Sequence, residues 1–404
     1  MKYGHFILGA ALVGGASPTF AQSKPIAIGD GVTLQPIIDA RLRYEAVDRD
    51  KPLTDADAVT LRLRSGFELK SGPFAFLAEA EGTLGIDNDY NDTNAGNGVE
   101  PFAIVADPEN VELNRLQLQY KTKAFTATVG RQRINLDDQR FVGAVGWRQN
   151  EQTFDAVRGE ATIGPVSLDG TYAISQRTIF GVDAGPRQAF DGDFIFLGAG
   201  VKAGPITIKA FGYLLDFDET IQFANSSKTF GARATGAIPL GGKAKLNVAA
   251  SYARQKDYGD NPFNYSADYI AGELGSTVAG FSIAAGYEKL GSGTGRAFQT
   301  PMATLHKFNG WADIFLTTPA AGLQDYYATI AYKFDVKALP GLNAGVTYHR
   351  FDSDAGDLRY GDEWNASIGF KVRKVGVLVK YADYDARRFS VDTQKLWLQL
   401  EWAY

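Results

Sequence analysis

Cysteine is absent from the 404 residues of the sequence, and methionine occurs only 2 times. Disulfide-stapled folds and metal sites ligated by cysteine are therefore excluded. Basic residues are not in excess, since 41 Lys and Arg stand against 46 Asp and Glu, a formal net charge of −5. Nucleic-acid-binding domains usually carry a strongly basic surface, so we expect no nucleic acid partner. Apolar runs of about 18 residues, which a membrane-spanning helix requires, are also missing.

Glycine and aromatic residues, in contrast, are abundant. The sequence contains 45 Gly, 26 Phe, 19 Tyr and 5 Trp, and 22% of its residues are charged. A disordered chain lacks the apolar side chains from which a core is built, so this composition indicates a folded protein.

The first residues have the pattern of a secretory signal peptide. Lys2 gives a positive start, residues 6–13 form a short apolar stretch, and the small residues Thr19 and Ala21 precede a cleavage point before Gln22. The apolar stretch is too short to span a bilayer. We interpret residues 1–21 as a signal peptide and residues 22–404 as a single domain, without a lipid anchor because no cysteine follows the cleavage point.

After residue 31, apolar side chains recur at every second position, which is the pattern of a β-strand with two different faces. In one segment, Leu61 and Leu63 alternate with Arg62 and Arg64. About 18 such segments follow one another, each close to the ~9–11 residues of a tilted membrane strand. They begin near residues 32, 57, 74, 112, 124, 153, 166, 193, 205, 228, 243, 266, 280, 324, 341, 360, 375 and 392.

The connections between these segments alternate between short and long without a break. Residues 71–73 and 164–165 are short connections, whereas residues 85–111 and 134–152 are long ones. Outer-membrane barrels have short periplasmic turns and long outer loops, and a soluble β-sandwich has no reason to sort its loops in this way. The sequence therefore predicts an all-β fold, a transmembrane antiparallel up-and-down β-barrel of about 18 strands in the bacterial outer membrane. An even number of strands places both the N- and the C-terminus in the periplasm.

The apolar face of such a barrel contacts outer-membrane lipid, and Tyr and Phe near the strand ends form interfacial girdles. The last segment carries Leu398, Leu400, Trp402 and Tyr404 on one face. This pattern resembles the terminal strand that the outer-membrane assembly machinery recognises. We therefore expect the barrel-assembly machinery to bind through Trp402 and Tyr404.

Eighteen strands enclose an aqueous channel, so charged residues on the inward face are the candidate functional residues. The inward positions of the first strands carry Arg41, Arg43, Arg62, Arg64, Arg115 and Arg158. Arg131 and Arg133 follow the outward parity of Val129, and a charge at the middle of the bilayer costs ~2–4 kcal/mol. We therefore expect the strand to end or bulge after Val129 and to place both arginines at the pore mouth.

Two roles are open for these eight arginines. Rings of basic residues make pores that prefer anions, so the arginines are the predicted binding site for anionic or sugar-like solutes. Alternatively, they form cross-strand pairs with inward carboxylates such as Glu79 and Glu81 and only stabilise the wall. The sequence alone does not decide between these roles.

Catalysis and bound cofactors have little support in the sequence. Beyond the signal peptide the chain contains only His306 and His349, and neither has an identifiable nucleophilic partner, so we expect no enzyme activity and no cofactor. Residues 87–92 (DNDYND) resemble part of a calcium loop, but Asp92 and Gly98 stand where the turn glycine and the bidentate glutamate are needed. No metal site is predicted there. The long loop 291–323 either folds into the pore or covers it from outside, with one helical turn at residues 311–316.

Three stretches resemble the alginate-export family of outer-membrane barrels. They are residues 106–120 (ADPENVELNRLQLQY), residues 129–158 (VGRQRINLDDQRFVGAVGWRQNEQTFDAVR) and residues 298–328 (FQTPMATLHKFNGWADIFLTTPAAGLQDYYA). The resemblance implies a barrel of about 18 strands with an arginine-rich lumen that passes an acidic polysaccharide. It also assigns wall and mouth positions to Arg115, Arg131, Arg133 and Arg158.

The second half of the chain departs from an arginine-rich lumen. Arg233 stands nearly alone there among inward positions that also include Glu273 and Glu288. We therefore predict a passive outer-membrane porin-type channel for small hydrophilic solutes, anionic or sugar-like. The alternatives are an export channel for an acidic polysaccharide such as alginate, and a surface adhesin or receptor that binds through its loops and has a closed lumen.

Overall fold

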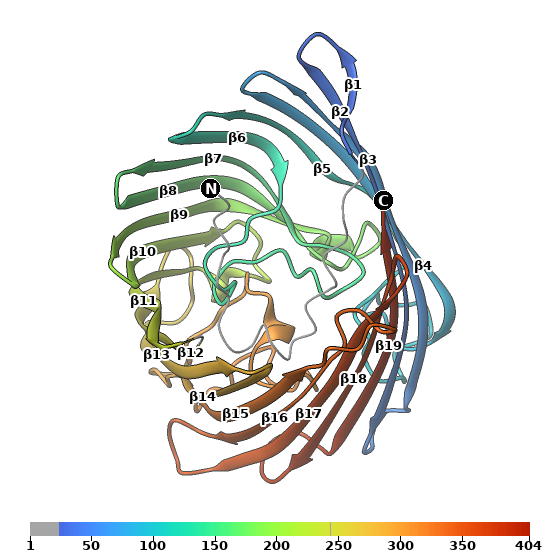
Figure 1. The fold of residues 1–404 in the computed structure, drawn as a ribbon. Coiled ribbons are helices and arrows are strands. Elements are labelled where there is room, and N and C mark those ends of the chain that lie inside the picture. Colours follow the sequence, from blue (N-terminus) through green and yellow to red (C-terminus); the bar gives the residue numbers. More distant parts are fainter. Residues whose placement is uncertain (1–23, 243) are drawn as a thin grey trace.

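The computed structural model describes residues 24–242 and 244–404, so the predicted signal peptide lies outside the described residues. The described chain forms one antiparallel sheet (Figure 1). A short strand, β1 (Ile26–Gly29), precedes eighteen longer ones. These are β2 (Val32–Arg49), β3 (Ala56–Ser71), β4 (Phe74–Asp89), β5 (Asn110–Lys121), β6 (Phe125–Gln132), β7 (Thr153–Ile163), β8 (Val166–Arg177), β9 (Ala189–Ala203), β10 (Ile206–Phe217), β11 (Ser227–Gly241), β12 (Ala244–Asp257), β13 (Ser266–Val278), β14 (Phe281–Leu290), β15 (Leu323–Lys333), β16 (Asn343–Asp352), β17 (Arg359–Val372), β18 (Val375–Ala386) and β19 (Thr393–Ala403).

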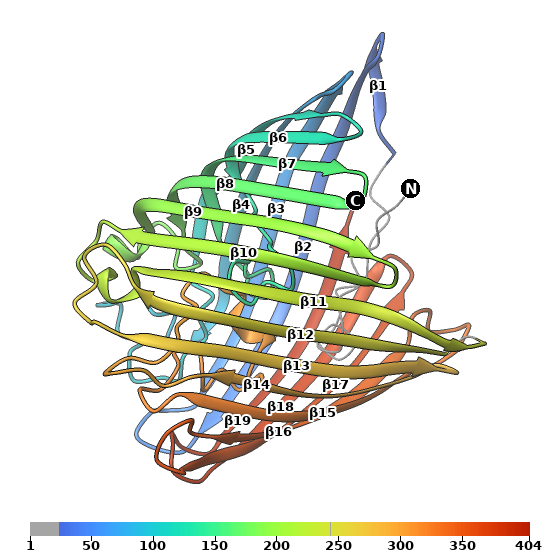
Figure 2. The same cartoon turned by 90° about the vertical axis from the view of Figure 1, so that its left-hand side faces the viewer.

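The sheet closes into a barrel, seen from two sides in Figures 1 and 2. Each strand from β2 to β18 pairs with the next, and β19 returns to pair with β2 from Thr393 opposite Arg49 to Ala403 opposite Asp39. The predicted antiparallel barrel of eighteen strands is therefore confirmed, and each predicted segment coincides with one strand. The sequence did not reveal β1, because four residues that fold back on β2 across Gly31 are too short to show a period.

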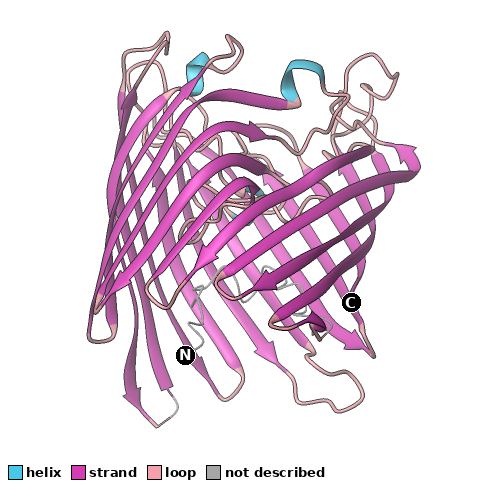
Figure 3. Cartoon of the chain, turned by 90° about the horizontal axis from the view of Figure 1, so that it is seen from above, coloured by secondary structure: helices cyan, strands magenta, loops and turns pink. Residues whose placement is uncertain are grey.

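The connections are sorted between the two ends of the barrel, with short turns at one end and long loops at the other (Figure 3). Three of the short turns have the sequence Gly-Pro, and their glycines Gly72, Gly164 and Gly204 have φ of 54°, 58° and 60°. A two-residue hairpin turn with glycine at its first central position needs this positive φ, whereas proline suits the second position. The long connections carry the 3₁₀ helices η1 (Gly185–Arg187), η2 (Phe223–Asn225) and η3 (Leu305–Lys307).

The two faces of the strands differ as the alternation predicts. In β3, Leu61 and Leu63 are 37% and 49% exposed, whereas Arg62 and Arg64 between and beyond them are buried on the lumenal side. This arrangement suits a barrel in lipid, where the outward face must be apolar and every backbone group must be paired. Among the described residues, no helix is long and apolar enough to cross a membrane.

Two long loops lie inside the barrel. They are residues 133–152, between β6 and β7, and residues 291–322, between β14 and β15, and they lie within the ring in Figure 1 in green and orange. We call them the first and the second inward loop. They meet at a bridge between Val142 and Met302.

Aromatic residues on the lumenal side of two strands explain why these loops turn inward. Phe194 and Phe196 of β9 and Phe211 of β10 are buried in one cluster with Phe298 and Met302 of the second inward loop. Complete burial of each such side chain contributes ~1.5–3 kcal/mol. The first inward loop contributes Val142 to the same cluster, so both loops cover apolar surface that would otherwise face water.

The helical turn predicted at residues 311–316 is wrong. The loop instead has its 3₁₀ turn at Leu305–Lys307. The backbone N–H groups of Trp311 and Ala312 both donate to a carboxylate oxygen of Glu363 on β17. These bonds hold Trp311 and Ala312 against the barrel wall.

Candidate functional site

Four lumenal arginines lie side by side on the first two long strands. Arg41 and Arg43 are on β2, Arg62 and Arg64 are on β3, and Arg41 stands directly opposite Arg62 in the pairing of these strands. We call these four residues the arginine cluster. Each is at most 6% exposed. Like charges that face each other across a strand pair destabilise a sheet unless other groups compensate.

Carboxylates supply this compensation. Arg41 donates to Glu401 of β19 at 2.9 Å, and Arg62 pairs with both Asp39 and Glu401. Arg64 pairs with Glu81 of β4 and with Glu151 of the first inward loop, the latter at 2.8 Å. Arg43 lies 3.4 Å from Asp107 and also donates to Gln399. Every member of the cluster therefore has at least one anionic partner.

The cluster also binds the backbone of the first inward loop. Arg41 Nη1 donates to the carbonyl oxygens of Gly146, Trp147 and Arg148 at 3.0–3.2 Å. Arg43 Nη2 donates to the Trp147 carbonyl at 2.6 Å. The cluster is therefore covered by the loop and holds it against the wall.

The other predicted site residues separate into three environments. Arg115 and Arg133 both pair with Glu79, and Arg133 also pairs with Glu151, so they extend the buried network. Burial alone would raise the pKa of Glu151, but Arg133 and Arg64 beside it lower that pKa to about 2. The loop carboxylate is therefore ionised at any working pH.

Arg131 and Arg158 lie outside this network. Arg131 stands opposite Leu116 and Asp155 in the strand pairing, on the outward side, and makes two hydrogen bonds of 2.8 Å to Asp155. Strand β6 ends one residue later, at Gln132. Arg158 lies on the lumenal side and pairs with Glu160 at 2.9 Å. The eight arginines thus do not form one ring.

The barrel wall and both inward loops meet at Lys380 of β18. Its ammonium nitrogen lies 3.8 Å from the ring centroid of Trp147 in the first inward loop and 3.8 Å from that of Trp311 in the second. It also lies 2.8 Å from Nε2 of His306, whose ring stacks on Trp147 with centroids 4.5 Å apart. We call Lys380, His306, Trp147 and Trp311 the Lys380 site. Cation–π contacts in a dehydrated setting contribute about 2 kcal/mol or more.

His306 is neutral in this arrangement. Burial lowers its pKa well below the ordinary value, and Lys380 adds to that effect, although Asp313 opposes it. The neutral ring donates from Nδ1 to Asp313, 2.8 Å away, and accepts at Nε2 from Lys380. Asp313 in turn binds Arg148 of the first inward loop at 2.8 Å. The two loops are therefore joined to each other as well as to the wall.

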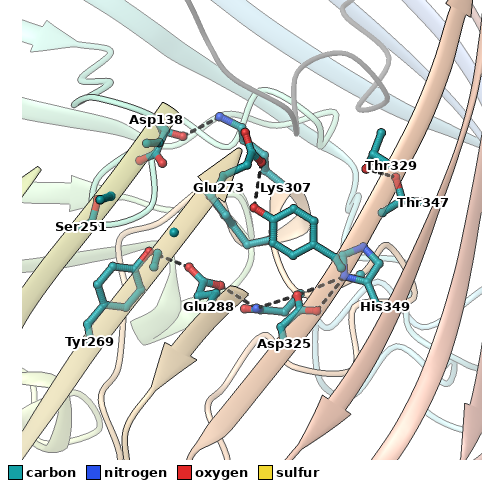
Figure 4. A pocket seen from close by; sticks show the side chains of 18 of the residues that line it. Asp138, Ser251, Tyr269, Glu273, Glu288, Lys307, Asp325, Thr329, Thr347 and His349 are labelled. Atoms are coloured by element: carbon teal, nitrogen blue, oxygen red, sulfur yellow. Dashed lines mark hydrogen bonds and ion pairs between the residues drawn. The ribbon is translucent and has the colours of Figure 1, made fainter. Parts of the chain in front are cut away.

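A cavity of about 100 Å³ lies between the second inward loop and the wall from β11 to β16 (Figure 4). Tyrosines, carboxylates and hydroxyls from the wall face Lys307 and Asn309 from the loop. The wall residues labelled in Figure 4 are Ser251, Tyr269, Glu273, Glu288, Asp325, Thr329, Thr347 and His349.

Most charges around the cavity are paired. Glu288 accepts hydrogen bonds from Arg140 at 2.7 Å and from Tyr269 at 2.7 Å. Asp325 binds Nδ1 of His349 at 2.9 Å, and Asp138 of the first inward loop pairs with Arg233. The acidic and basic groups around the cavity are therefore interleaved, and most of them neutralise each other in pairs.

The sequence analysis did not single out Lys380, Trp147 or Trp311. Lys380 stands between Val379 and Tyr381, so alternation alone would have placed it in the lumen. Nothing in the local pattern shows, however, that two distant tryptophans enclose it. The run DNDYND bends through Asx-type bonds, such as the one from Asn94 N–H to Asp92 at 2.8 Å. Among the described residues, no group of three acidic or histidine side chains is placed to hold a metal ion.

Comparison with known proteins identifies relatives of the fold and of the sequence. The outer-membrane proteins OpdK and OpdQ of Pseudomonas aeruginosa both superpose with a TM-score of 0.70, at 14% and 17% identity. The match covers 92% of this chain in both cases, and 98% and 97% of those chains. OccAB3 of Acinetobacter baumannii has a TM-score of 0.66 and 16% identity, with 91% of this chain and 99% of that chain covered.

Among curated proteins, none matches the sequence. A family model described as alginate export matches residues 34–269, which is more than half of the chain. Together with the closed eighteen-stranded barrel, this match defines an integral outer-membrane channel of the porin type, and the chain belongs to the alginate-export family.

Proposed function

We propose that the protein is a passive outer-membrane channel for small hydrophilic solutes, anionic or sugar-like, without catalytic activity. The observation that carries this proposal is the pair of inward loops, which cross the lumen and leave a polar cavity of about 100 Å³. A cavity of this size is suited to a small solute, since about 10–15 Å³ of such space already holds one water molecule. One similar structure, of OpdK, contains vanillate, a carboxylate, and this supports a small anion as the class of solute.

The fixation of the loops favours small solutes over a polymer. The first inward loop is held by the buried ion pair of Glu151 with Arg64 and by the carbonyl bonds to Arg41. Removing one partner of a buried pair costs ~3–5 kcal/mol. An acidic polysaccharide that passes through the lumen would have to displace these contacts between the loop and the wall. Export of such a polymer, which the family match favours, therefore requires both loops to leave the lumen.

We also propose that the short turns and both termini face the periplasm and that the barrel-assembly machinery binds the last strand. Tyr404 is 49% exposed and its ring lies 6.2 Å from that of Trp402, so both offer an aromatic surface at the end of β19. An epitope inserted at Gly96, in a long loop, should be accessible on intact cells, whereas one at Gly164, in a short turn, should not. The reverse labelling would contradict this orientation.

Planar-bilayer recording of the purified barrel tests the proposed function. We expect stable ion conductance in this recording. In a separate liposome-swelling assay, we expect small sugars or carboxylates to enter the liposomes. An acidic oligosaccharide of ten or more units, roughly as long as one strand, should not enter. A barrel that swells in the oligosaccharide would support polymer export instead. A barrel without any conductance would support the loop-mediated adhesin or receptor.

A further inference from the structure

Two charged groups at the cavity remain outside its ion pairs. Glu273 is 8% exposed, and its Oε2 accepts a hydrogen bond from the Tyr327 hydroxyl at 2.8 Å. Its other oxygen, Oε1, is buried and has no hydrogen-bond partner in the described part of the chain. Lys307 donates to the backbone carbonyl of Asp138 at 2.7 Å. Within the described residues, neither Glu273 nor Lys307 takes part in a side-chain ion pair of 4.0 Å or less.

The two groups border the same cavity. Glu273 projects from β13 and Lys307 from the second inward loop, and both line it (Figure 4). Burial lowers the pKa of Lys307 and Arg233 lowers it further, while Asp138 and Glu273 nearby favour its charged form. A carboxylate with a free acceptor oxygen and an ammonium with free donors therefore face a common space. Buried polar groups are normally satisfied, so each calls for a partner of the opposite kind.

We propose that the cavity binds a small solute that carries both an ammonium and a carboxylate group, as an α-amino acid does. The solute ammonium donates to Glu273 Oε1, and the solute carboxylate accepts from Lys307 Nζ. This inference rests on the proposed channel function and narrows its anionic class to solutes with both charges. The other acidic groups have partners, Glu288 with Arg140, Asp138 with Arg233 and Asp325 with His349, which leaves Glu273 and Lys307 as one charge of each sign for the solute.

Three solutes of similar size separate this proposal from its alternatives. L-Serine has both charges, lactate has only the carboxylate, and glycerol has neither. With the complete barrel in a planar bilayer at neutral pH, we expect L-serine to reduce the ion current at about a tenfold lower concentration than lactate. One hydrogen bond to a charged group corresponds to such a factor. Equal effects of L-serine and lactate in the unmodified protein would overturn the proposal, and this comparison needs no variant.

Two variants then assign the charges. Glu273→Gln should weaken the effect of L-serine about tenfold and leave that of lactate unchanged, since only the ammonium loses its acceptor. Lys307→Gln should weaken both. Glu160→Gln is the matched control, because Glu160 is a lumenal carboxylate outside the cavity that pairs with Arg158, and it should change neither. If Glu273→Gln folds and leaves the effect of L-serine unchanged, the proposal is wrong.

Binding without conduction distinguishes this inference from the proposed function. Trp311 lines the cavity, so its fluorescence reports on an occupant even in a closed barrel. Binding of L-serine without ion conductance would refute the channel and support the amino-acid site. Conductance without any preference for L-serine in either measurement would support the channel and refute the site.

Discussion

The two halves of the lumen use their charges differently. On the side of β2 and β3, the arginine cluster is buried beneath the first inward loop, and each guanidinium has a carboxylate partner. On the side of β11 to β16, the wall borders an open cavity where Glu273 and Lys307 remain without ion pairs in the described structure. The arginine half therefore carries many charged side chains, but few of them are free to contact a solute. If the solute binds in the cavity, as we propose, charge density along a strand does not mark the place where it binds.

The largest expected effect breaks the arginine half. Replacing Arg62 and Arg64 with Gln leaves Asp39, Glu81 and Glu151 with fewer cationic partners, and breaking one buried pair already costs ~3–5 kcal/mol. We expect a marked loss of resistance to denaturation, measured by heat-modifiable migration of the folded barrel. The reversal potential in a salt gradient should stay unchanged, because these arginines do not face the solute. A shift of that potential in a folded double variant would show that the cluster selects ions after all.

The next effect joins the two halves. Lys380→Met retains much of the side-chain volume but removes the charge between Trp147 and Trp311, and we expect a loss of about 2 kcal/mol in the anchoring of both loops. Hydrogen exchange should rise in both inward loops together, and the open-channel current should become noisier. Lys228→Met is the matched control. Lys228 also lies over an aromatic ring, 5.8 Å from that of Tyr258, but this contact involves neither inward loop. Faster exchange in one loop only would mean that Lys380 does not couple them.

Acid should distinguish the two halves. His306 has a pKa lowered by burial, and Asp313, Lys380 and Arg148 are the charged groups that face it. Once the second inward loop is released, the histidine regains an ordinary pKa near 6.5 and binds a proton more readily, so anchoring weakens as the pH falls below about 6.5.

The expected loss is at most about 1.4 kcal/mol per pH unit, measured as hydrogen exchange in residues 291–322. Within the first inward loop, only the residues around Trp147, which stacks on His306, should share this response, because at the arginine cluster arginine stays protonated and the pKa of Glu151 is about 2. His306→Gln should remove the response. An identical acid response in that variant would assign it to another group.

The smallest expected effect is in ion selectivity. Lys307→Gln removes a cation that borders the cavity, and we expect the permeability ratio to shift toward cations by up to about fivefold, equivalent to ~1 kcal/mol. The reversal potential in a salt gradient measures this shift. A larger shift from Arg62 and Arg64 than from Lys307 would reverse the comparison between the two halves.

The barrel itself could be predicted from the sequence because each strand reports its two environments locally. Leu61 and Leu63 face lipid, Arg62 and Arg64 face the lumen, and the period of two follows directly. The long loops, in contrast, are placed by contacts between distant segments. The partners of Arg41 include the backbone carbonyl groups of residues 146–148. Every residue has a backbone carbonyl, so the sequence does not indicate which ones bind Arg41. The interior of the barrel was therefore beyond the reach of periodicity.

The same limit explains the individual misses. The aromatic residues Phe194 and Phe196 occupy lumenal positions that the rule for membrane barrels reserves for polar residues, and they belong to an apolar cluster that the wall and both inward loops build together. The backbone N–H groups of Trp311 and Ala312 likewise bind Glu363 on β17, so contacts with the wall fix this segment, which has no helical turn. In both cases a contact across the lumen overrides the preference of a segment.

The pairing of β19 with β2 makes the order of the strands cyclic. In a closed ring, every strand has two neighbours. The pair of β19 and β2 differs from the other pairs only in that no turn of the backbone connects the two strands. New ends cut into the Gly-Pro turn at Gly164, with the old ends joined by a short linker, would leave every strand pair intact. A chain that stops before Thr393, however, leaves two open strand edges, and each unpaired backbone group in hydrocarbon costs several kcal/mol. The barrel can therefore be rearranged as a permuted ring but cannot be shortened by one strand.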